Sequence, residues 1–176
     1  YVGTSVCGPS RYSLLAGLHT GKSPIRGNAG SGRDLNILGQ DEMIPSILQK
    51  ANYSTAIIGK WGFSSHPLKS GFDYFYGFAT HKEAHTFMPL TLTEKRISDS
   101  DPYSYDNIAL PDNTNADATL CKVDTLVEST CSYGPKLIYE KVIEYIDDYV
   151  ESESINPFFL YYADLIPHVA SWTPDE

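Results

Sequence analysis

The sequence predicts an α/β fold in which helices flank a mainly parallel sheet. Stretches with the helical spacing of apolar residues alternate with short, almost uninterrupted apolar runs, which are typical of strands buried on both faces. The chain has 176 residues and is 41% hydrophobic, which is enough to bury the core of one domain. No apolar run reaches the length of about 18 residues that a membrane-spanning helix needs.

The first predicted helix covers residues 9–18. Proline is well tolerated in the first turn of a helix, where Pro9 lies, and Leu14, Leu15 and Leu18 share one face. Glycines in and after this stretch favour its end. The pattern therefore predicts a short amphipathic helix close to the start of the chain.

A second helix and a strand are predicted next to each other. Residues 41–52 are interpreted as a short helix, because acidic residues occupy the first turn and Asn52 follows the end. Residues 53–59, with the sequence YSTAIIG, predict a buried strand. The carboxyl end of this strand places Lys60 and Trp61 in a loop.

The middle of the chain, residues 63–132, is rich in Gly, Pro, Asn, Asp, Ser and Thr. This composition predicts long loops with few regular elements. Within it, the stretch GFDYFYGF at residues 71–78 is interpreted as an aromatic insert that packs against the sheet edge. Loops of this length are uncommon in a compact domain unless they are functional, so they predict the rim of an active site.

Helical spacing returns at residues 134–153, where Pro135 lies at the start and an apolar stripe runs along one side. Asp147 and Asp148 fall on the opposite side, so we expect both carboxylates to be solvated rather than to bind a metal. This segment predicts the longest helix of the chain.

The last predicted element is a buried strand within residues 156–168, an almost continuous apolar run that ends at His168. Ligands of α/β proteins gather at the carboxyl ends of parallel strands. Lys60 and His168 both fall at such ends, so the topology is expected to bring them to the same edge of the sheet.

The charge distribution limits the class of ligand. The formal net charge is −9, yet the first 61 residues carry +3 and the remainder carries −12. An acidic protein is a poor candidate for binding nucleic acid, whereas a basic first third suits a small anionic ligand. Ordinary solvated surface charge explains the same numbers equally well.

Three cysteines are present, and they fall into two groups. Cys121 and Cys131 are ten residues apart in a polar segment, where a local disulfide is plausible in an oxidising compartment. Cys7 remains unpaired, at the start of the first helix, where free N–H groups and the helix dipole favour an anion. It is either a buried thiol or a chemical group that works with Arg11, one turn further along.

A thiol phosphatase is excluded by the spacing of these residues. Its phosphate-binding loop needs a cysteine and an arginine six positions apart, but Ser13 stands six positions after Cys7 and Arg11 only four. Pro9 also lacks a backbone N–H that such a loop would use.

Three motifs resemble those of the sulfatase family, in the family's order. They are CGPSRYSLLAG at residues 7–17, NYSTAIIGKWG at 52–62 and PFFLYYADLIPH at 157–168. The resemblance spans residues 1–176 and implies an alkaline-phosphatase-like α/β fold. It further implies that these residues are the central part of a single sulfatase catalytic domain, a partial domain that lacks both ends.

The resemblance also implies a mechanism for hydrolysing an aryl or carbohydrate sulfate ester. A formylglycine-generating enzyme would oxidise Cys7 to Cα-formylglycine, whose hydrate carries two hydroxyls on one carbon. One hydroxyl would attack sulfur, and the other would later expel sulfate as the aldehyde re-forms. Arg11 would hold the hydrate, Lys60 would bind a sulfate oxygen, and His168 would bind sulfate and protonate the leaving oxygen.

A divalent cation, usually calcium in this family, is implied as the cofactor. It would bind the hydrate oxygen formed at Cys7 together with the sulfate group. The resemblance implies that the carboxylate ligands of the family come from an Asp pair well before the cysteine and from an Asp-Asn or Asp-Gln pair well after His168, outside this segment. The acidic residues of the chain itself have no metal-ligand spacing.

One position departs from the family pattern. Arylsulfatases often carry a histidine two residues after the motif lysine, where this chain has Gly62. His85 or His66 is expected to substitute as the proton donor, and His85 is a candidate for substrate binding. His19 either lines the pocket or lies on the surface.

Two other functions stay open, namely a phosphonate or phosphate monoester hydrolase of the same superfamily and a non-catalytic, truncated binder of sulfated glycans. The family implies a secreted, lysosomal or periplasmic protein. The glycosylation triplet at residues 52–54 agrees with that location, although its position beside a predicted buried strand argues against its use. The isolated segment is expected to be inactive.

Overall fold

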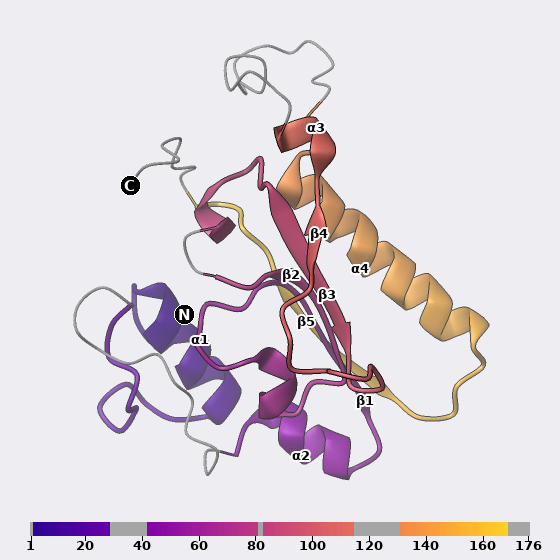
Figure 1. Ribbon diagram of the computed structural model, residues 1–176. Coiled ribbons are helices and arrows are strands. Elements are labelled where there is room, and N and C mark those ends of the chain that lie inside the picture. Colours follow the sequence, from indigo (N-terminus) through magenta and orange to yellow (C-terminus); the bar gives the residue numbers. More distant parts are fainter. Residues whose placement is uncertain (1, 29–41, 81–82, 115–130, 169–176) are drawn as a thin grey trace.

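The computed structural model describes residues 2–28, 42–80, 83–114 and 131–168, which form a five-stranded sheet between helices (Figure 1). The strands are β1 (Ser54–Lys60), β2 (Tyr74–Phe78), β3 (Thr91–Arg96), β4 (Asn107–Ala109) and β5 (Phe158–Ala163). The helices are α1 (Cys7–Ala16), α2 (Ile44–Lys50), α3 (Pro111–Thr114) and α4 (Gly134–Glu151), with 3-10 turns η1 (Pro67–Ser70) and η2 (Glu83–His85). No described helix is both long enough and apolar enough to cross a membrane.

The predicted α/β architecture is confirmed, and the sheet is mixed. The strand order is β4-β3-β2-β1-β5, in which β1 pairs in parallel with both β2 and β5. The pairs β2 with β3 and β3 with β4 are antiparallel. The parallel strands therefore occupy one half of the sheet, and the antiparallel strands come from the region that the sequence predicted to be loops.

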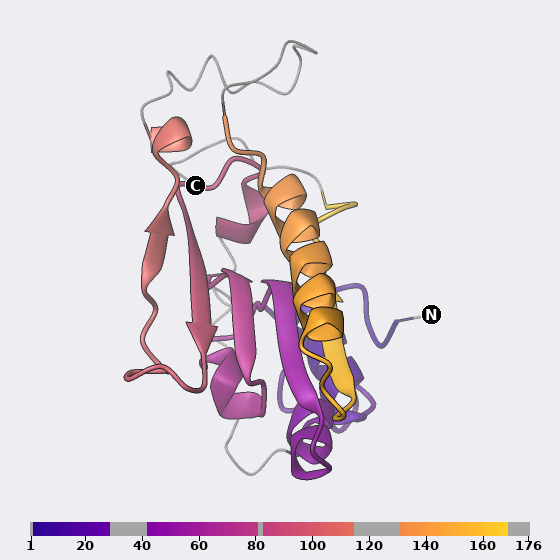
Figure 2. The same ribbon diagram turned by 90° about the vertical axis from the view of Figure 1, so that its right-hand side faces the viewer.

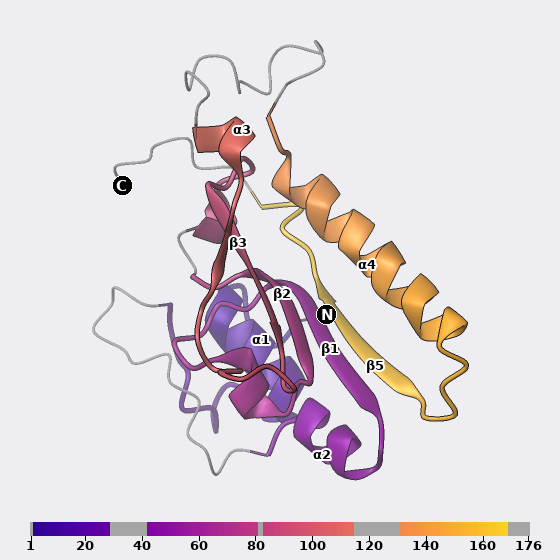
Figure 3. The ribbon, with the colours of Figure 1, turned by 45° about the vertical axis from the view of Figure 1, so that its right-hand side comes forward.

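Helices cover both faces of the sheet (Figures 2 and 3). Helix α4 lies along one face, where Ile138 and Val142 pack with Ile58 of β1. Helices α1 and α2 lie against the other face, where Tyr12 and Leu15 pack with Ile57. Because neighbouring residues of β1 point to opposite faces, one strand contributes to both apolar cores.

Helix α1 begins at Cys7, two residues before the predicted start, and ends at Gly17, which adopts the left-handed conformation with φ of 64°. The predicted leucine face is wrong in part. Leu15 is buried together with Tyr12, whereas Leu14 is 57% exposed. Tyr12 rather than Leu14 completes the face, because positions three residues apart lie on the same side of a helix.

Residues 71–78 are not an insert at the sheet edge, which corrects the sequence prediction. Residues 74–78 form β2, a strand inside the sheet between β1 and β3, and all five of its residues are buried. A strand covered on both faces needs no alternation of polar and apolar residues, so its aromatic run resembles an insert in the sequence. The prediction that residues 63–132 are mostly loops is wrong for the same region, since it also contains β3 and β4.

The predicted second helix, strand and long helix are confirmed with shifted ends. Helix α2 is shorter than residues 41–52, and Glu42 in front of it forms an ion pair with Lys50 at 2.6 Å. Strand β1 extends to Lys60, which is its last residue rather than part of a loop. On α4, Asp147 and Asp148 are exposed, as predicted.

The last strand, β5, is less buried than predicted. Among the described residues it pairs only with β1, so it lies at an edge of the sheet. Phe158 is 37% exposed and Tyr162 is 40% exposed. The apolar run therefore overstates burial in the segment described, although it locates the strand correctly.

Candidate active site

Cys7 is the first residue of α1, directly after the extended residue Val6, whose side chain makes no capping hydrogen bond. The N–H of Gly8 donates instead to Oδ1 of Asn28 at 2.9 Å. The first helical bond runs from the N–H of Ser10 to the carbonyl of Val6 at 3.0 Å. Asn28 therefore secures the turn that carries Cys7, a role the sequence did not indicate because Asn28 is 20 positions from Gly8.

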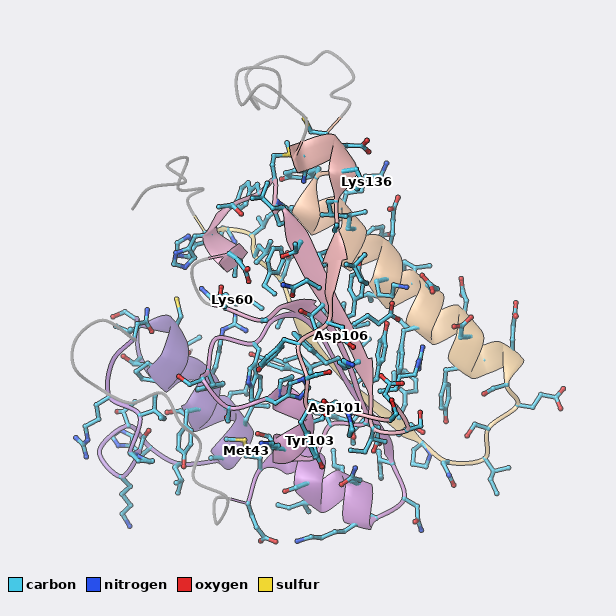
Figure 4. The ribbon with its side chains drawn as sticks, in the orientation of Figure 1. Met43, Lys60, Asp101, Tyr103, Asp106 and Lys136 are labelled. Atoms are coloured by element: carbon cyan, nitrogen blue, oxygen red, sulfur yellow. The ribbon has the colours of Figure 1, made fainter. Side chains whose placement is uncertain are left out.

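Lys60 lies at the carboxyl end of β1, and its side chain reaches Cys7. Lys60 is only 3% exposed, and Cys7 lies close enough to interact electrostatically with its ammonium. Its Nζ also lies 2.9 Å from Nε2 of His85. Figure 4 shows Lys60 between α1 and the short turn η2. The buried ammonium thus contacts His85 and lies near Cys7, which is 78 positions before that histidine in the chain.

The environment of Lys60 lowers its pKa below the ordinary value. Burial is the largest cause, because it disfavours the charged form. The proximity of Cys7 acts in the opposite direction, and the guanidinium of Arg11 lowers the pKa further. Electrostatic interactions are strong here, since little water separates these groups.

His85 and His168 stack on each other beside Lys60. Their ring centroids are 4.1 Å apart and the planes differ by 17°. His85 belongs to η2, whereas His168 follows β5 and is exposed. Burial, followed by the charges of Lys60 and His168, lowers the pKa of His85 to about 4. His85 is therefore neutral at pH 7.

Arg11 connects α1 to the ends of two strands. Its Nη1 donates to the carbonyl of Lys60 at 2.6 Å and to the hydroxyl of Tyr161 on β5 at 3.3 Å. Burial raises the pKa of Tyr161, and the nearby Arg11 opposes that shift. The sequence predicted that Arg11 works with Cys7. It did not predict the contact with Tyr161, which resembles any other aromatic residue of an apolar run.

The other histidines named by the sequence lie in different surroundings. His66 is buried, its Nδ1 accepts a hydrogen bond from the N–H of Leu68 at 3.3 Å, and its ring packs against Tyr105. His19 is exposed and accepts a hydrogen bond from the N–H of Gly21 within a turn. The structure thus brings His85, rather than His66 or His19, to Lys60.

The described part of the chain does not contain a metal centre. No group of three or more His, Cys, Asp or Glu side chains in residues 2–28, 42–80, 83–114 and 131–168 could hold an ion. Cys7 is a free thiol and is only partly buried. Cys131 is disulfide-bonded, and Cys121, its predicted partner, lies outside the described residues.

A cavity of about 380 Å³ lies elsewhere, beside the amino-terminal end of β1, and is lined by residues that include Thr55, Tyr74, Arg96 and Lys141. Its cations are engaged by neighbouring side chains. Arg96 stacks over the ring of Tyr74 at 4.3 Å, and Lys141 pairs with Glu144 at 2.8 Å. The cavity contains no cysteine, so the group around Cys7 is the better candidate for catalysis.

Three distant segments thus meet around Cys7, and each of them belongs to one of the three motifs. A sequence model of the sulfatase family matches residues 1–176. The chain belongs to the sulfatase family. Helix α1, strand β1 and strand β5 are therefore the parts of this sulfatase chain that gather the motif residues.

Curated sulfatases support the same membership. Arylsulfatase G of Rattus norvegicus is 28% identical over 181 residues, which cover 92% of this chain and 32% of that protein. N-acetylgalactosamine-6-sulfatase of Mus musculus is 34% identical over 93 residues, which cover 44% of this chain and 17% of that protein. The sulfatase chain described here spans about a third or less of the length of these relatives.

Solved structures show the fold. A sulfatase from Pseudoalteromonas sp. superposes with a TM-score of 0.65 at 18% identity, covering 95% of this chain and 35% of that one. A protein solved with its substrate D-glucosamine-2-N,6-O-disulfate gives a TM-score of 0.63 at 22% identity, covering 96% and 26%. The fold of this sulfatase chain is accordingly alkaline-phosphatase-like, as the motifs implied.

Proposed function

We propose that the full protein containing this chain hydrolyses a sulfate ester of an aryl alcohol or a carbohydrate. The observation that carries the proposal is the buried Lys60, which lies near Cys7 and contacts His85 of the stacked pair of His85 and His168. Membership of the sulfatase family supports the same reaction. A buried cation next to a candidate nucleophile suits the transfer of an anionic group, because the charge acts there without water to weaken it.

Cys7 would act after its conversion to formylglycine. The hydrate would supply two hydroxyls on one carbon, one to accept the sulfuryl group and one to allow its release. In the folded chain Gly8 and Pro9 are buried and Arg11 is bonded to β1 and β5. A formylglycine-generating enzyme would therefore have to read Cys7, Pro9 and Arg11 before α1 packs onto the sheet.

Lys60 would bind a sulfate oxygen beside the residue formed from Cys7. A lysine ammonium has three donors and no acceptor, so its 2.9 Å contact with Nε2 of His85 requires that nitrogen to accept. The proton of neutral His85 then resides on Nδ1. His85 would therefore orient Lys60, while the exposed His168 would be the ring that meets the leaving oxygen and protonates it.

Arg11 would hold the first turn of α1, which carries Cys7, against the sheet. One of its nitrogens binds both the Lys60 carbonyl and the Tyr161 hydroxyl, which fixes α1 relative to β1 and β5. We infer that this connection keeps Cys7 and Lys60 in register, in addition to the charge that Arg11 contributes to the site.

A calcium ion or another divalent cation is not accommodated by the described residues, which hold no cluster of ligands. The partly buried Cys7 supplies only one position. We infer that carboxylates from elsewhere in the full protein complete any metal site. Residues 1–176 would then be the central part of one catalytic domain, and the isolated segment would be inactive.

A secreted, lysosomal or periplasmic location is proposed from the family and agrees with the disulfide at Cys131, since disulfides persist in oxidising compartments. The partners of the full protein would be a sulfate ester and the modifying enzyme. The acidic net charge of −9 gives no support to nucleic-acid binding.

The proposal is tested by comparing matched esters with the full-length protein. We expect release of sulfate from an aryl sulfate or a sulfated sugar at a rate well above that of phosphate from the corresponding phosphate ester. A preference for the phosphate or phosphonate ester would instead establish the related hydrolase.

A second measurement follows the modification itself. Conversion of the Cys7 thiol to an aldehyde lowers the mass of its peptide by about 18 Da. Full-length protein from a host with the modifying enzyme should carry this change. An unmodified thiol together with tight binding of a sulfated glycan and no turnover would show a non-catalytic binder.

A further inference from the structure

We propose that Asn52 is a site of N-linked glycosylation, on the exposed turn between α2 and β1. Residues 52–54 read Asn-Tyr-Ser, the acceptor triplet for an N-linked oligosaccharide. The predicted buried strand argued against its use, but the structure places Asn52 on the surface. Burial begins only at Thr55, which is 1% exposed. The acceptor side chain thus precedes the buried part of the strand.

Within the described residues, the backbone of this turn forms hydrogen bonds, whereas the side chain of Asn52 forms none. The N–H of Asn52 donates to the carbonyl of Gln49 at 3.0 Å, and the N–H of Tyr53 donates to the carbonyl of Leu48 at 3.0 Å. The side-chain amide of Asn52 makes no hydrogen bond to any residue that the structure describes. A glycan attached there would displace no contact of the fold.

A conformational role for the asparagine does not explain the whole triplet. Asn52 has φ of 65°, a left-handed conformation that asparagine tolerates after the end of a helix. A left-handed conformation at Asn52 does not require a serine or threonine at position 54. Ser54 bonds through its backbone to the carbonyl of Pro157 at 2.9 Å, and within the described segments its hydroxyl has no partner. Neither polar side chain of the triplet is therefore used by the part of the fold that the structure describes.

The surroundings leave room for a large group. Lys50 and Ala51 before the triplet are exposed, and so is the neighbouring loop of residues 152–157. Helix α2 and the start of β1 lie at the lower end of the sheet in Figure 1, away from η2. Six residues of strand separate Ser54 from Lys60, or roughly 20 Å at about 3.3 Å per residue. A glycan on Asn52 would consequently leave the site around Cys7 open.

The modification would take place on a protein entering a eukaryotic-type secretory route, so it depends on the location proposed above. The donor would be an oligosaccharide attached to a polyprenyl diphosphate. The amide nitrogen of Asn52 forms a bond to the anomeric carbon, the bond from that carbon to the diphosphate oxygen breaks, and the amide loses one proton. Polyprenyl diphosphate leaves, and no oxidant or reductant is needed.

The test is peptide mass analysis of the full-length protein expressed through a eukaryotic secretory pathway. We expect the peptide with Asn52 to carry hexosamine-containing glycans. Treatment with a peptide N-glycosidase should remove them and convert the asparagine to aspartate, a mass gain of about 1 Da. Asn52→Asp should abolish the glycan, and aspartate also tolerates the left-handed conformation.

A matched pair at Ser54 separates glycosylation from folding. Ser54→Thr keeps the acceptor triplet, whereas Ser54→Val has nearly the same shape without the hydroxyl. Glycan on the first variant and none on the second supports the proposal. An unmodified Asn52 in folded wild type and in Ser54→Thr, or a protein that never enters the pathway, would overturn it. Sulfate release by Asn52→Asp should equal that of wild type, so this result is independent of the proposed catalytic function.

Discussion

At the scale of single residues, the guanidinium of Arg11 joins parts of the chain that are up to 150 positions apart. It contacts the Lys60 carbonyl and the Tyr161 hydroxyl, so it links the three motifs physically. Motif resemblance alone predicts Cys7, Arg11, Lys60 and His168 as site residues. It did not indicate the contact of Tyr161 with Arg11 or that of Asn28 with Gly8, because both contacts arise from folding and not from spacing in the sequence.

The first prediction concerns Tyr161 as a positioning residue. Tyr161→Phe removes the hydroxyl that accepts from Arg11 while keeping the ring in place. Loss of a hydrogen bond to a charged group should lower kcat about 10-fold with KM nearly unchanged, since the effect is on the register of Cys7 and Lys60. The measurement is steady-state hydrolysis of an aryl sulfate by the full-length protein.

Tyr162→Phe is the matched control for this prediction. The Tyr162 hydroxyl donates to Asp164 at 3.0 Å, on a side chain that is 40% exposed. It should leave kcat unchanged. Equal losses in the two variants, or a loss in Tyr161→Phe that merely follows a lower melting temperature, would show that the hydroxyl has no positioning role.

At the scale of elements, the packing of β1 depends on close approach of backbones that only glycine allows. Gly59 has φ of 118°, and a Cβ there would lie 2.2 Å from the carbonyl oxygen of Ala163 on β5. Gly77 on β2 similarly has no room, since its Cβ would lie 2.0 Å from the carbonyl oxygen of Gly59. Three parallel strands thus meet at a point just before Lys60.

Gly59→Ala is therefore expected to destabilise the domain severely. The clash is with backbone, which cannot move without breaking strand pairing, so we expect a loss of at least about 3 kcal/mol in the free energy of unfolding. Chemical denaturation of the full-length protein measures it. Gly17→Ala is the control, because Gly17 has φ of 64° but nothing within 4 Å of its Cβ. It should cost only about 1 kcal/mol. Similar costs at the two positions would refute the close-approach argument.

Some helices and strands could be predicted from the sequence pattern and others could not. Helix α4 and strand β1 have strong apolar periodicity or a continuous apolar run, and both were predicted. Strands β3 and β4 were not predicted. Strand β4 is only three residues long and all three are exposed, and β3 carries charged residues. Lys95 of β3 is nevertheless buried and pairs with Asp106. Such pairing depends on tertiary contacts that composition does not reveal.

At the scale of the whole molecule, acid should weaken the fold through a buried histidine outside the site. His66 lies among Lys69, Lys95 and Asp101, with the rings of Tyr103 and Tyr105 against it. Burial first, and then the two lysines, lower the pKa of His66 to about 4 from its ordinary 6.5. The unfolded chain therefore takes up the proton more readily than the folded one between these values.

The contribution of neutral His66 to the free energy of unfolding is accordingly at its full value above about pH 6.5. It is lost as the pH falls towards about 4. The loss should be on the order of 2 kcal/mol. His66→Asn keeps an acceptor for the N–H of Leu68 but does not titrate, so it should reduce this decline. Denaturant unfolding of the full-length protein at several pH values measures the slope. An unchanged slope in the variant would assign the acid sensitivity to other groups.

The whole fold was predictable in class but incompletely in topology. The α/β class follows from alternating helical and strand patterns, which local sequence records well. The mixed sheet and the central position of β2 follow from which strands meet, and that is decided by packing far apart in the chain. The same limit applies to the site, where the contact of Lys60 with His85 depends on η2, a turn of only three residues.

Turnover of an aryl sulfate by full-length wild type and by Cys7→Ala tests the central claim most directly. If a group formed from Cys7 takes the sulfuryl group beside Lys60, the variant should lose at least about a thousandfold in kcat while remaining folded. Sulfate release by folded Cys7→Ala at the wild-type rate would contradict the account.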